Sequence, residues 1–267
     1  MTVGDVLDGA FKLFKANART AILTAAAIVV PFDLLLAFLQ RHNTFGGESL
    51  GTIFNNSGQV SSSSPNPLVI VAAYTVPFLL LHLVTGALAS VAASSYIGGD
   101  DPGPAASLRA TGMMLGPLLA SFVVIHLVEW PMLAFCILPG LIFMSLWVRT
   151  APVIAIEHLG AIAAMRRAWR LGQPRLFPTM GVVLLAWIIV TALNIALSIV
   201  PTVAGLAIGT ASGGWVLVGI GTVLSRAVTA PILAMVTTLL YFDARIRHEG
   251  FDLAILAQGL ERGAPPA

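Results

Sequence analysis

A series of long apolar runs constrains this chain more than any other feature. The runs lie at about residues 20–40, 68–97, 110–129, 132–155, 176–200 and 215–242. A helix that crosses a bilayer needs about 20 apolar residues, and in lipid the backbone groups must be satisfied within the segment or a closed barrel. Charged residues make up 10% of the sequence, whereas a soluble domain has about 25%. The sequence therefore predicts an all-α, polytopic membrane protein with six transmembrane helices.

The positions of the positive charges predict how these spans are oriented. An even number of spans places both termini on one side, and that side collects nearly all of the Lys and Arg residues. They are Lys12, Lys15, Arg19, Arg109, Arg149, Arg166, Arg167, Arg170, Arg175, Arg245, Arg247 and Arg262. The opposite side carries only Arg41. Because cytoplasmic loops hold the excess of Lys and Arg, we expect an N-in, C-in topology.

Residue usage indicates where such a protein resides. Arg outnumbers Lys twelve to two, which indicates a GC-rich bacterial genome. We therefore expect a multi-pass protein of the bacterial plasma membrane, with the lipid bilayer as its first partner. The net charge of +2 does not indicate nucleic-acid binding, because the basic residues lie beside apolar spans.

Amphipathic segments flank and interrupt the membrane domain, residues 20–242. Residues 1–19 predict an N-terminal helix in the interface plane, with a polar leader as the alternative. In the central segment, residues 149–175, an apolar face predicted to lie on the membrane consists of Ile162, Met165 and Trp169. The basic residues beside it either contact anionic lipid headgroups or only mark topology: Arg166, Arg167, Arg170 and Arg175. Residues 243–267 are predicted to form a cytoplasmic tail.

A faint internal rhythm accompanies these segments. Three times, a short amphipathic segment precedes a pair of spans. The positions that correspond are Leu7/Ala10, Leu108/Thr111 and Met165/Ala168. This pattern indicates either three repeated hairpin units or a chance similarity in a chain rich in Ala, Leu and Val.

Two ionisable residues at membrane depth are the first candidate site. Asp33 in the first span and Arg226 in the sixth both lie about 20 Å from the cytoplasmic ends of their spans, at about 1.5 Å per residue. Such groups are costly in lipid and usually face the bundle interior. We favour a structural ion pair between them over a transport site, with Glu129 as an alternative partner for Arg226.

Three further residues form a second candidate. His82, His126 and Glu129 are residue types that bind metals or carry protons, and His126 and Glu129 share a helix face as H-x-x-E. We favour the interpretation in which each histidine hydrogen-bonds a neighbour. The single cysteine, Cys136, gives no internal disulfide and is expected to be buried. No catalytic, metal or cofactor motif is present, so we expect no enzyme activity and no cofactor.

Several motifs carry a family resemblance. They are Pro139-Gly140, Pro152, Glu157, Ala164 to Trp169 with Leu171, the ending Tyr241 to Asp252 and the opening Thr2 to Phe11. With them the chain resembles a broad group of bacterial six-span proteins, which includes the membrane domain of glycerophosphoryl diester phosphodiesterases and related uncharacterised families. In those phosphodiesterases the catalytic work belongs to a separate soluble barrel domain. We expect no such barrel here, so the resemblance implies a membrane module of unassigned function.

These features lead to two functional hypotheses. The first is a non-catalytic integral membrane scaffold or accessory protein that acts through lipids, including anionic headgroups, or through a membrane-protein partner. The alternative is a small transporter or channel that uses the intramembrane residues Asp33 and Arg226.

Overall fold

The computed structural model describes residues 3–43, 49, 66–97 and 101–250. Within these residues the chain is α-helical with no strand. Its α-helices are α1 (Val3–Ala16), α2 (Ala18–Leu39), α4 (Pro67–Ile97), α5 (Gly103–Met113), α6 (Leu115–Phe135), α7 (Ile137–Trp147), α8 (Thr150–Glu157), α9 (Ala161–Gly172), α10 (Leu176–Ile208) and α11 (Trp215–Glu249). Six helical segments are long and apolar enough to cross a membrane, which confirms the predicted fold class.

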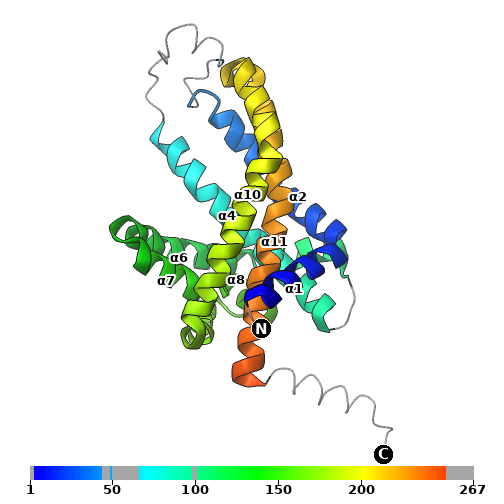
Figure 1. Cartoon of the computed structure of the whole chain (residues 1–267), viewed down its shortest axis with the longest axis vertical. Helices are drawn as coiled ribbons and strands as arrows, with labels where there is room; N and C mark the ends of the chain where they lie inside the picture. Colours follow the sequence, from blue (N-terminus) through cyan, green and yellow to red (C-terminus); the bar gives the residue numbers. More distant parts are fainter. Residues whose placement is uncertain (1–2, 44–48, 50–65, 98–100, 251–267) are drawn as a thin grey trace, which may run out of the picture.

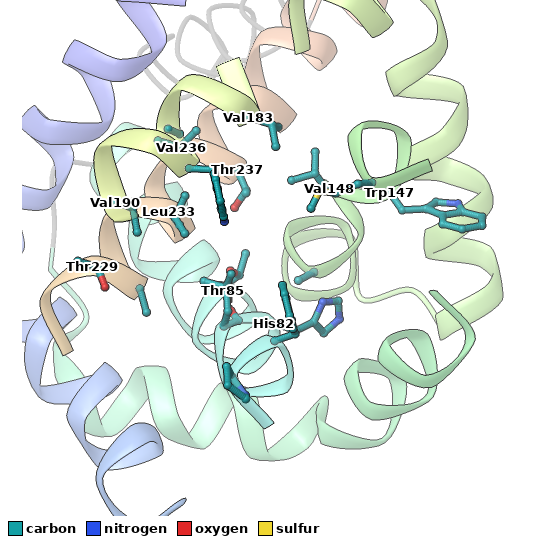
Figure 2. Close-up of a pocket in the computed structure, with 18 of the residues that line it drawn as sticks. His82, Thr85, Trp147, Val148, Val183, Val190, Thr229, Leu233, Val236 and Thr237 are labelled. Carbon is teal, nitrogen blue, oxygen red and sulfur yellow. Dashed lines mark hydrogen bonds between the residues drawn. The ribbon is translucent and has the colours of Figure 1, made fainter. Parts of the chain in front are cut away.

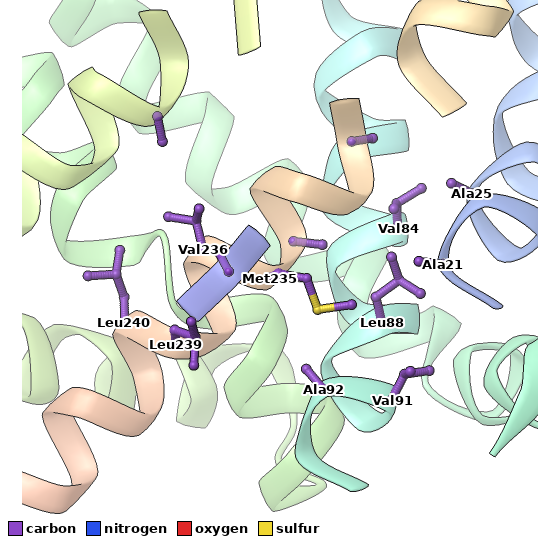
Figure 3. Packing of buried hydrophobic residues seen from close by; sticks show 14 of the residues in the cluster. Ala21, Ala25, Val84, Leu88, Val91, Ala92, Met235, Val236, Leu239 and Leu240 are labelled. Atoms are coloured by element: carbon purple, nitrogen blue, oxygen red, sulfur yellow. The ribbon is translucent and has the colours of Figure 1, made fainter. Parts of the chain in front are cut away.

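The longest helices, α10 and α11, form an antiparallel pair along the long axis of the molecule (Figure 1). α11 also packs against α1, α2 and α4. Small residues on α2 let the helices approach closely, because short side chains permit near contact between backbones. Figure 3 shows this core, in which the labelled residues are Ala21, Ala25, Val84, Leu88, Val91, Ala92, Met235, Val236, Leu239 and Leu240.

Glycines make the turn between α10 and α11. A Cβ atom on Gly205 would lie 2.4 Å from the carbonyl oxygen of Gly214, so neither position has room for a side chain. Gly209 and Gly213 have φ angles of 95° and 105°, which L side chains rarely adopt. Gly205 therefore allows the close approach of the two helices, and Gly209 allows the change of chain direction.

The turn between the third and fourth spans lies later than the sequence indicates. The predicted turn at residues 129–131 is wrong, because α6 continues through Pro131 to Phe135. The chain breaks at Cys136, which is extended. Pro139 favours this position, since its ring would clash with the carbonyl of Phe135 in a continuous helix.

The two helices that flank this turn touch closely. A Cβ atom on Gly140 would lie 2.5 Å from the Leu133 side chain, so the glycine allows α7 to fold back onto α6. In Figure 1 both helices lie at a steep angle to α10. The predicted burial of Cys136 is wrong, because this side chain is exposed at the apolar tip together with Phe135 and Ile137.

The predicted fourth span, 132–155, is not one helix. It is divided into α7 and α8 by a turn at Val148 and Arg149. The third span begins at Leu115 and not near residue 110, since α5 ends at Met113. The helices of the fifth and sixth spans continue past the predicted span ends to Ile208 and Glu249. Residues 243–249 of the predicted tail thus continue α11, and residues 251–267 lie outside the described chain.

The amphipathic helices α1 and α9 pack their apolar faces on other helices. Val6 and Ala10 of α1 are buried in the main core. The predicted membrane face of α9 is only partly correct. Ile162 is exposed, but Met165 is buried, and Trp169 stacks near Phe143 and Trp147 with ring centroids 5.8 and 5.9 Å away. The driving force for the placement of α9 is therefore burial against protein.

The predicted internal rhythm has a structural counterpart. In each of the short helices α1, α5 and α9, two residues one turn apart are buried in the same register of the proposed repeat. These pairs are Val6/Ala10, Ser107/Thr111 and Ala164/Ala168. Buried pairs at this spacing are common to amphipathic helices, so the repeat stays a prediction.

Candidate functional site

The site is a cavity of about 390 Å³ between α4, α6, α7, α10 and α11. This volume lies in the range of small-molecule pockets, about 300–1,000 Å³. Figure 2 shows side chains around it, with Thr85 and His82 on α4, Val190 on α10 and Thr237 on α11. Most of the wall is apolar. The polar residues that line it are His82, Thr85, His126, Glu129, Thr191, Asn194, Arg226, Thr229 and Thr237.

An ion pair stands behind one wall of the cavity. Arg226 Nη1 on α11 donates a hydrogen bond to Asp33 Oδ1 on α2, which confirms the predicted pair. The Asp33 side chain has no exposed surface, whereas the Arg226 side chain is 22% exposed and lines the cavity. Arg226 therefore connects a buried carboxylate with the cavity.

The second carboxylate oxygen of Asp33 takes no part in the ion pair. Its Oδ2 atom is buried and has no hydrogen-bond partner among the residues described. The carboxylate thus makes a single contact in a position where unsatisfied polar atoms are costly. The pair is consequently an incompletely satisfied ion pair, and removal of Arg226 would leave the acid without its cation.

Glu129 is the isolated acid of the cavity. It lies on α6, is 7% exposed and lines the same space as Arg226. Within the described part of the chain, no ion pair or hydrogen bond involves its carboxyl group. Asp33, and not the alternative Glu129, is therefore the partner of Arg226. A buried charge without a partner is unfavourable, so Glu129 requires a proton or a cationic ligand.

The two histidines bond to their surroundings, as the favoured interpretation predicts. His126 Nδ1 donates to the Phe122 carbonyl oxygen at 3.0 Å. The Ser121 hydroxyl donates to the Leu118 carbonyl, so it accepts a hydrogen bond of 3.0 Å from His82 Nε2. In their neutral forms both rings keep one acceptor nitrogen. The described residues contain no group of three His, Cys, Asp or Glu that could hold a metal ion.

A polar contact joins α10 and α11 through Thr229, three residues after Arg226. Thr229 donates to the Ser225 carbonyl at 2.8 Å and lies 3.3 Å from Asn194 Oδ1. Asn194 is bonded to its own helix through the Val190 carbonyl. Sequence reasoning does not single out Thr229, since a threonine in an apolar helix usually bonds to its own backbone.

A second group of charges lies at the far end of α11, and we call it the terminal ion-pair network. Arg167 bonds to Glu157 at 3.1 Å and to Glu249 at 2.7 Å. Tyr241 donates to Glu157 at 2.9 Å, and Arg245 donates to Tyr241 and Glu249, each at 3.1 Å. The network joins α8, α9 and α11. The hydrogen bond from Arg167 lowers the pKa of Glu249, which lies beyond the apolar part of α11.

This network corrects part of the predicted lipid contact. Arg167 and Arg175 are engaged within the protein, Arg175 with Asp243 at 3.3 Å. Arg166 and Arg170 are exposed on α9 and keep the predicted role as candidates for anionic headgroups. The difference arises because carboxylates on α8 and α11 lie within reach of the guanidinium groups of Arg167 and Arg175.

Arg149 has a role that the sequence does not indicate. Its position near a span end suggests a surface charge, but the residue is 2% exposed. It donates to the Leu240 carbonyl at 3.1 Å, the Ser145 carbonyl at 3.4 Å and the Thr179 hydroxyl at 2.6 Å. Arg149 therefore ties the α7–α8 break to α10 and α11. The nearby signal in the sequence is Pro152, because a proline is tolerated in the first turn of a helix and so indicates a helix start close to Arg149.

Comparison with known proteins identifies no relative of this chain. No protein-family model, curated protein or solved structure matches the chain. The resemblance to the membrane domain of glycerophosphoryl diester phosphodiesterases therefore stays a prediction.

Proposed function

We propose that this protein is a small, non-catalytic membrane transporter whose substrate binds in the intramembrane cavity. The observation that carries the proposal is the cavity itself, because it brings Glu129, Arg226 and two histidines to one apolar space within the membrane. Ionisable residues at this depth usually mark substrate or ion pathways. A protein that acts only as a scaffold has no need for them in a cavity.

The helices around the cavity also favour a transporter. Pro77 lies inside α4 and lines the cavity, and Pro231 lies inside α11. A proline in a helix interior removes one backbone hydrogen bond and is a common site of bending. Bending at these positions would change the width of the cavity.

Adjacent threonines on α11 provide a test that needs no known substrate. Thr237 lines the cavity, whereas Thr238 is fully buried, and both hydroxyls bond to the Ala234 carbonyl. In a Cys136→Ser background, Thr237→Cys should react with a membrane-impermeant maleimide added to either side of sealed vesicles. The matched control Thr238→Cys should stay unlabelled. Equal protection of both cysteines would reject a transport pathway.

The second candidate function is a scaffold that recruits anionic lipid. It is favoured by exposed Arg166 and Arg170 on α9, near the end that we propose to be cytoplasmic. Each surface arginine contributes about 1 kcal/mol of attraction to an anionic membrane. In nanodiscs with mixed lipids, this function predicts enrichment of phosphatidylglycerol around the wild type and its loss in Arg166→Gln/Arg170→Gln.

We also propose an N-in, C-in orientation in the bacterial plasma membrane. Arg41 stands at the opposite end of the bundle from the terminal ion-pair network, where its guanidinium lies 3.9 Å from the Phe38 ring centre. The excess of basic residues near the network favours the cytoplasm for that end. Protease protection of tags at each terminus in right-side-out vesicles tests this orientation.

A further inference from the structure

We propose that the cavity binds a monovalent organic cation with an apolar body, and that Glu129 exchanges its proton for this cation. The proposal names a substrate class for the transporter suggested above and rests on that function. Three observations carry it: the balance of charge, the isolation of Glu129 and the aromatic wall.

The charges around the cavity leave one acid without compensation. Arg226 is paired with Asp33, so these two residues contribute no net charge. Glu129 is buried in the same cavity, and no cation bonds to it within the described chain. The ionised cavity therefore carries one negative charge in excess, which favours a cationic ligand.

The other polar groups that line this space add no second acid among the described residues. From α4 the group is His82, from α10 Asn194, and from α6 itself His126. The histidines use one ring N–H each in bonds to Ser121 and the Phe122 carbonyl. Arg226 from α11 is the one fixed cation among the lining residues described, and Asp33 holds it.

The exchange of proton for cation follows from burial. An ionised carboxylate without a partner in an apolar cavity is strongly unfavourable, so Glu129 carries a proton when the cavity holds no cation. When an organic cation enters, the O–H bond of Glu129 breaks and the proton passes to bulk solvent. The carboxylate then pairs with the cation. One positive charge leaves as one arrives, so the charge of the cavity is unchanged.

The wall of the cavity selects an organic cation over a metal ion. It contains the aromatic residues Phe78, Trp130, Trp147 and Trp187. Aromatic faces attract organic cations, and Trp attracts them best. Sodium, by contrast, needs several oxygen ligands to replace its hydration shell, and most of the wall is apolar.

Calorimetry on the purified full chain tests the proposal with tetraphenylphosphonium as the probe. Titrations in two buffers that differ in ionisation enthalpy count the protons released. We expect close to one proton per bound cation and an affinity that rises about tenfold per pH unit while Glu129 is protonated in the free protein. The anion tetraphenylborate, of matched size, should bind at least tenfold more weakly.

Glu129→Gln should remove the proton release and weaken cation binding at least tenfold. Asp8→Asn, which removes an exposed acid from α1, should leave both unchanged. If Glu129→Gln does not fold, the pH profile and the anion comparison on the wild type decide the matter. A pH-independent affinity, or equal binding of both probes, would overturn the proposal.

The outcome for transport is separable. Tetraphenylphosphonium bound with proton release but not carried across proteoliposome membranes would contradict transport and support the cation site. Labelling of Thr237→Cys from both sides without cation binding would support transport and overturn the cation site.

Discussion

Asp33 on α2 and Arg226 on α11 form an ion pair across 193 positions of sequence, and the carboxylate side of that pair is completely buried. The pair joins the first and last spans at membrane depth. Its arginine is also part of the cavity wall. A change at Asp33 therefore acts on the stability of the bundle and on the charge of the cavity together.

Asp33→Asn should destabilise the protein by about 3–5 kcal/mol, because it leaves a buried arginine without its counter-charge. Arg226→Gln should have a similar cost. The double variant Asp33→Asn/Arg226→Gln should be more stable than the sum of the single changes predicts, as measured by thermal unfolding in detergent. Strictly additive losses would show that the two side chains do not interact.

Gly205→Ala should destabilise the turn between α10 and α11 by about 1–3 kcal/mol, because the new Cβ atom meets the Gly214 backbone. Gly181→Ala is the matched control on the same helix, since nothing lies within 4 Å of its Cβ position. That control should be neutral or stabilising by up to about 1 kcal/mol. Equal unfolding temperatures for the two variants would contradict the close contact.

Arg149→Met should cost at least about 2 kcal/mol, because it leaves the Leu240 carbonyl and the Thr179 hydroxyl without their donor. Arg149→Lys should restore little, since an ammonium cannot reproduce the fork of donors. Arg109→Met, at an exposed position on α5, serves as the control. Unfolding by denaturant in mixed micelles measures all three.

The terminal ion-pair network should weaken in acid. The pKa of Glu249 is lowered in the folded protein by its bond from Arg167. An acid with a lowered folded pKa stabilises the protein above its unfolded value, about 4.3, and loses this contribution as pH falls through the folded value. The unfolding temperature should therefore fall as the pH drops below about 4.3.

Glu249→Gln should reduce this pH dependence and cost under about 1 kcal/mol at pH 7, because its side chain is 28% exposed and screened. Asp8 pairs with Lys12, and the Asp8 side chain is 64% exposed. Asp8→Asn should therefore leave the pH dependence of the unfolding temperature unchanged. If the unfolding temperature of Glu249→Gln falls at low pH as much as that of the wild type, other groups cause the pH dependence.

Cys136 should react with a lipid-soluble maleimide and resist a water-soluble one in intact membranes. It is exposed at a tip between Phe135 and Ile137, which are 87% and 69% exposed and apolar. Such a tip is favourable only in lipid. Mass spectrometry of membranes labelled before solubilisation measures the difference. Ready labelling by the water-soluble reagent would place the tip in water.

The sequence by itself determined the class of the fold and the number of spans. Long apolar runs such as 68–97 partition into a bilayer through their composition alone, and a backbone in lipid must be helical to satisfy its hydrogen bonds. The same argument identified Asp33 and Arg226, because an ionisable group at membrane depth needs a partner. These are properties of short stretches of chain.

The tertiary structure alone decided which surfaces meet. The turn at Cys136 depends on the contact of Gly140 with Leu133, and the burial of Arg149 depends on carbonyl and hydroxyl groups from α10 and α11. The isolation of Glu129 likewise follows from which helices surround it. A hydropathy scale does not distinguish a residue that faces lipid from one that faces the protein interior, because both surroundings are apolar. Only the packing of distant helices distinguishes a residue that faces lipid from one that faces a cavity.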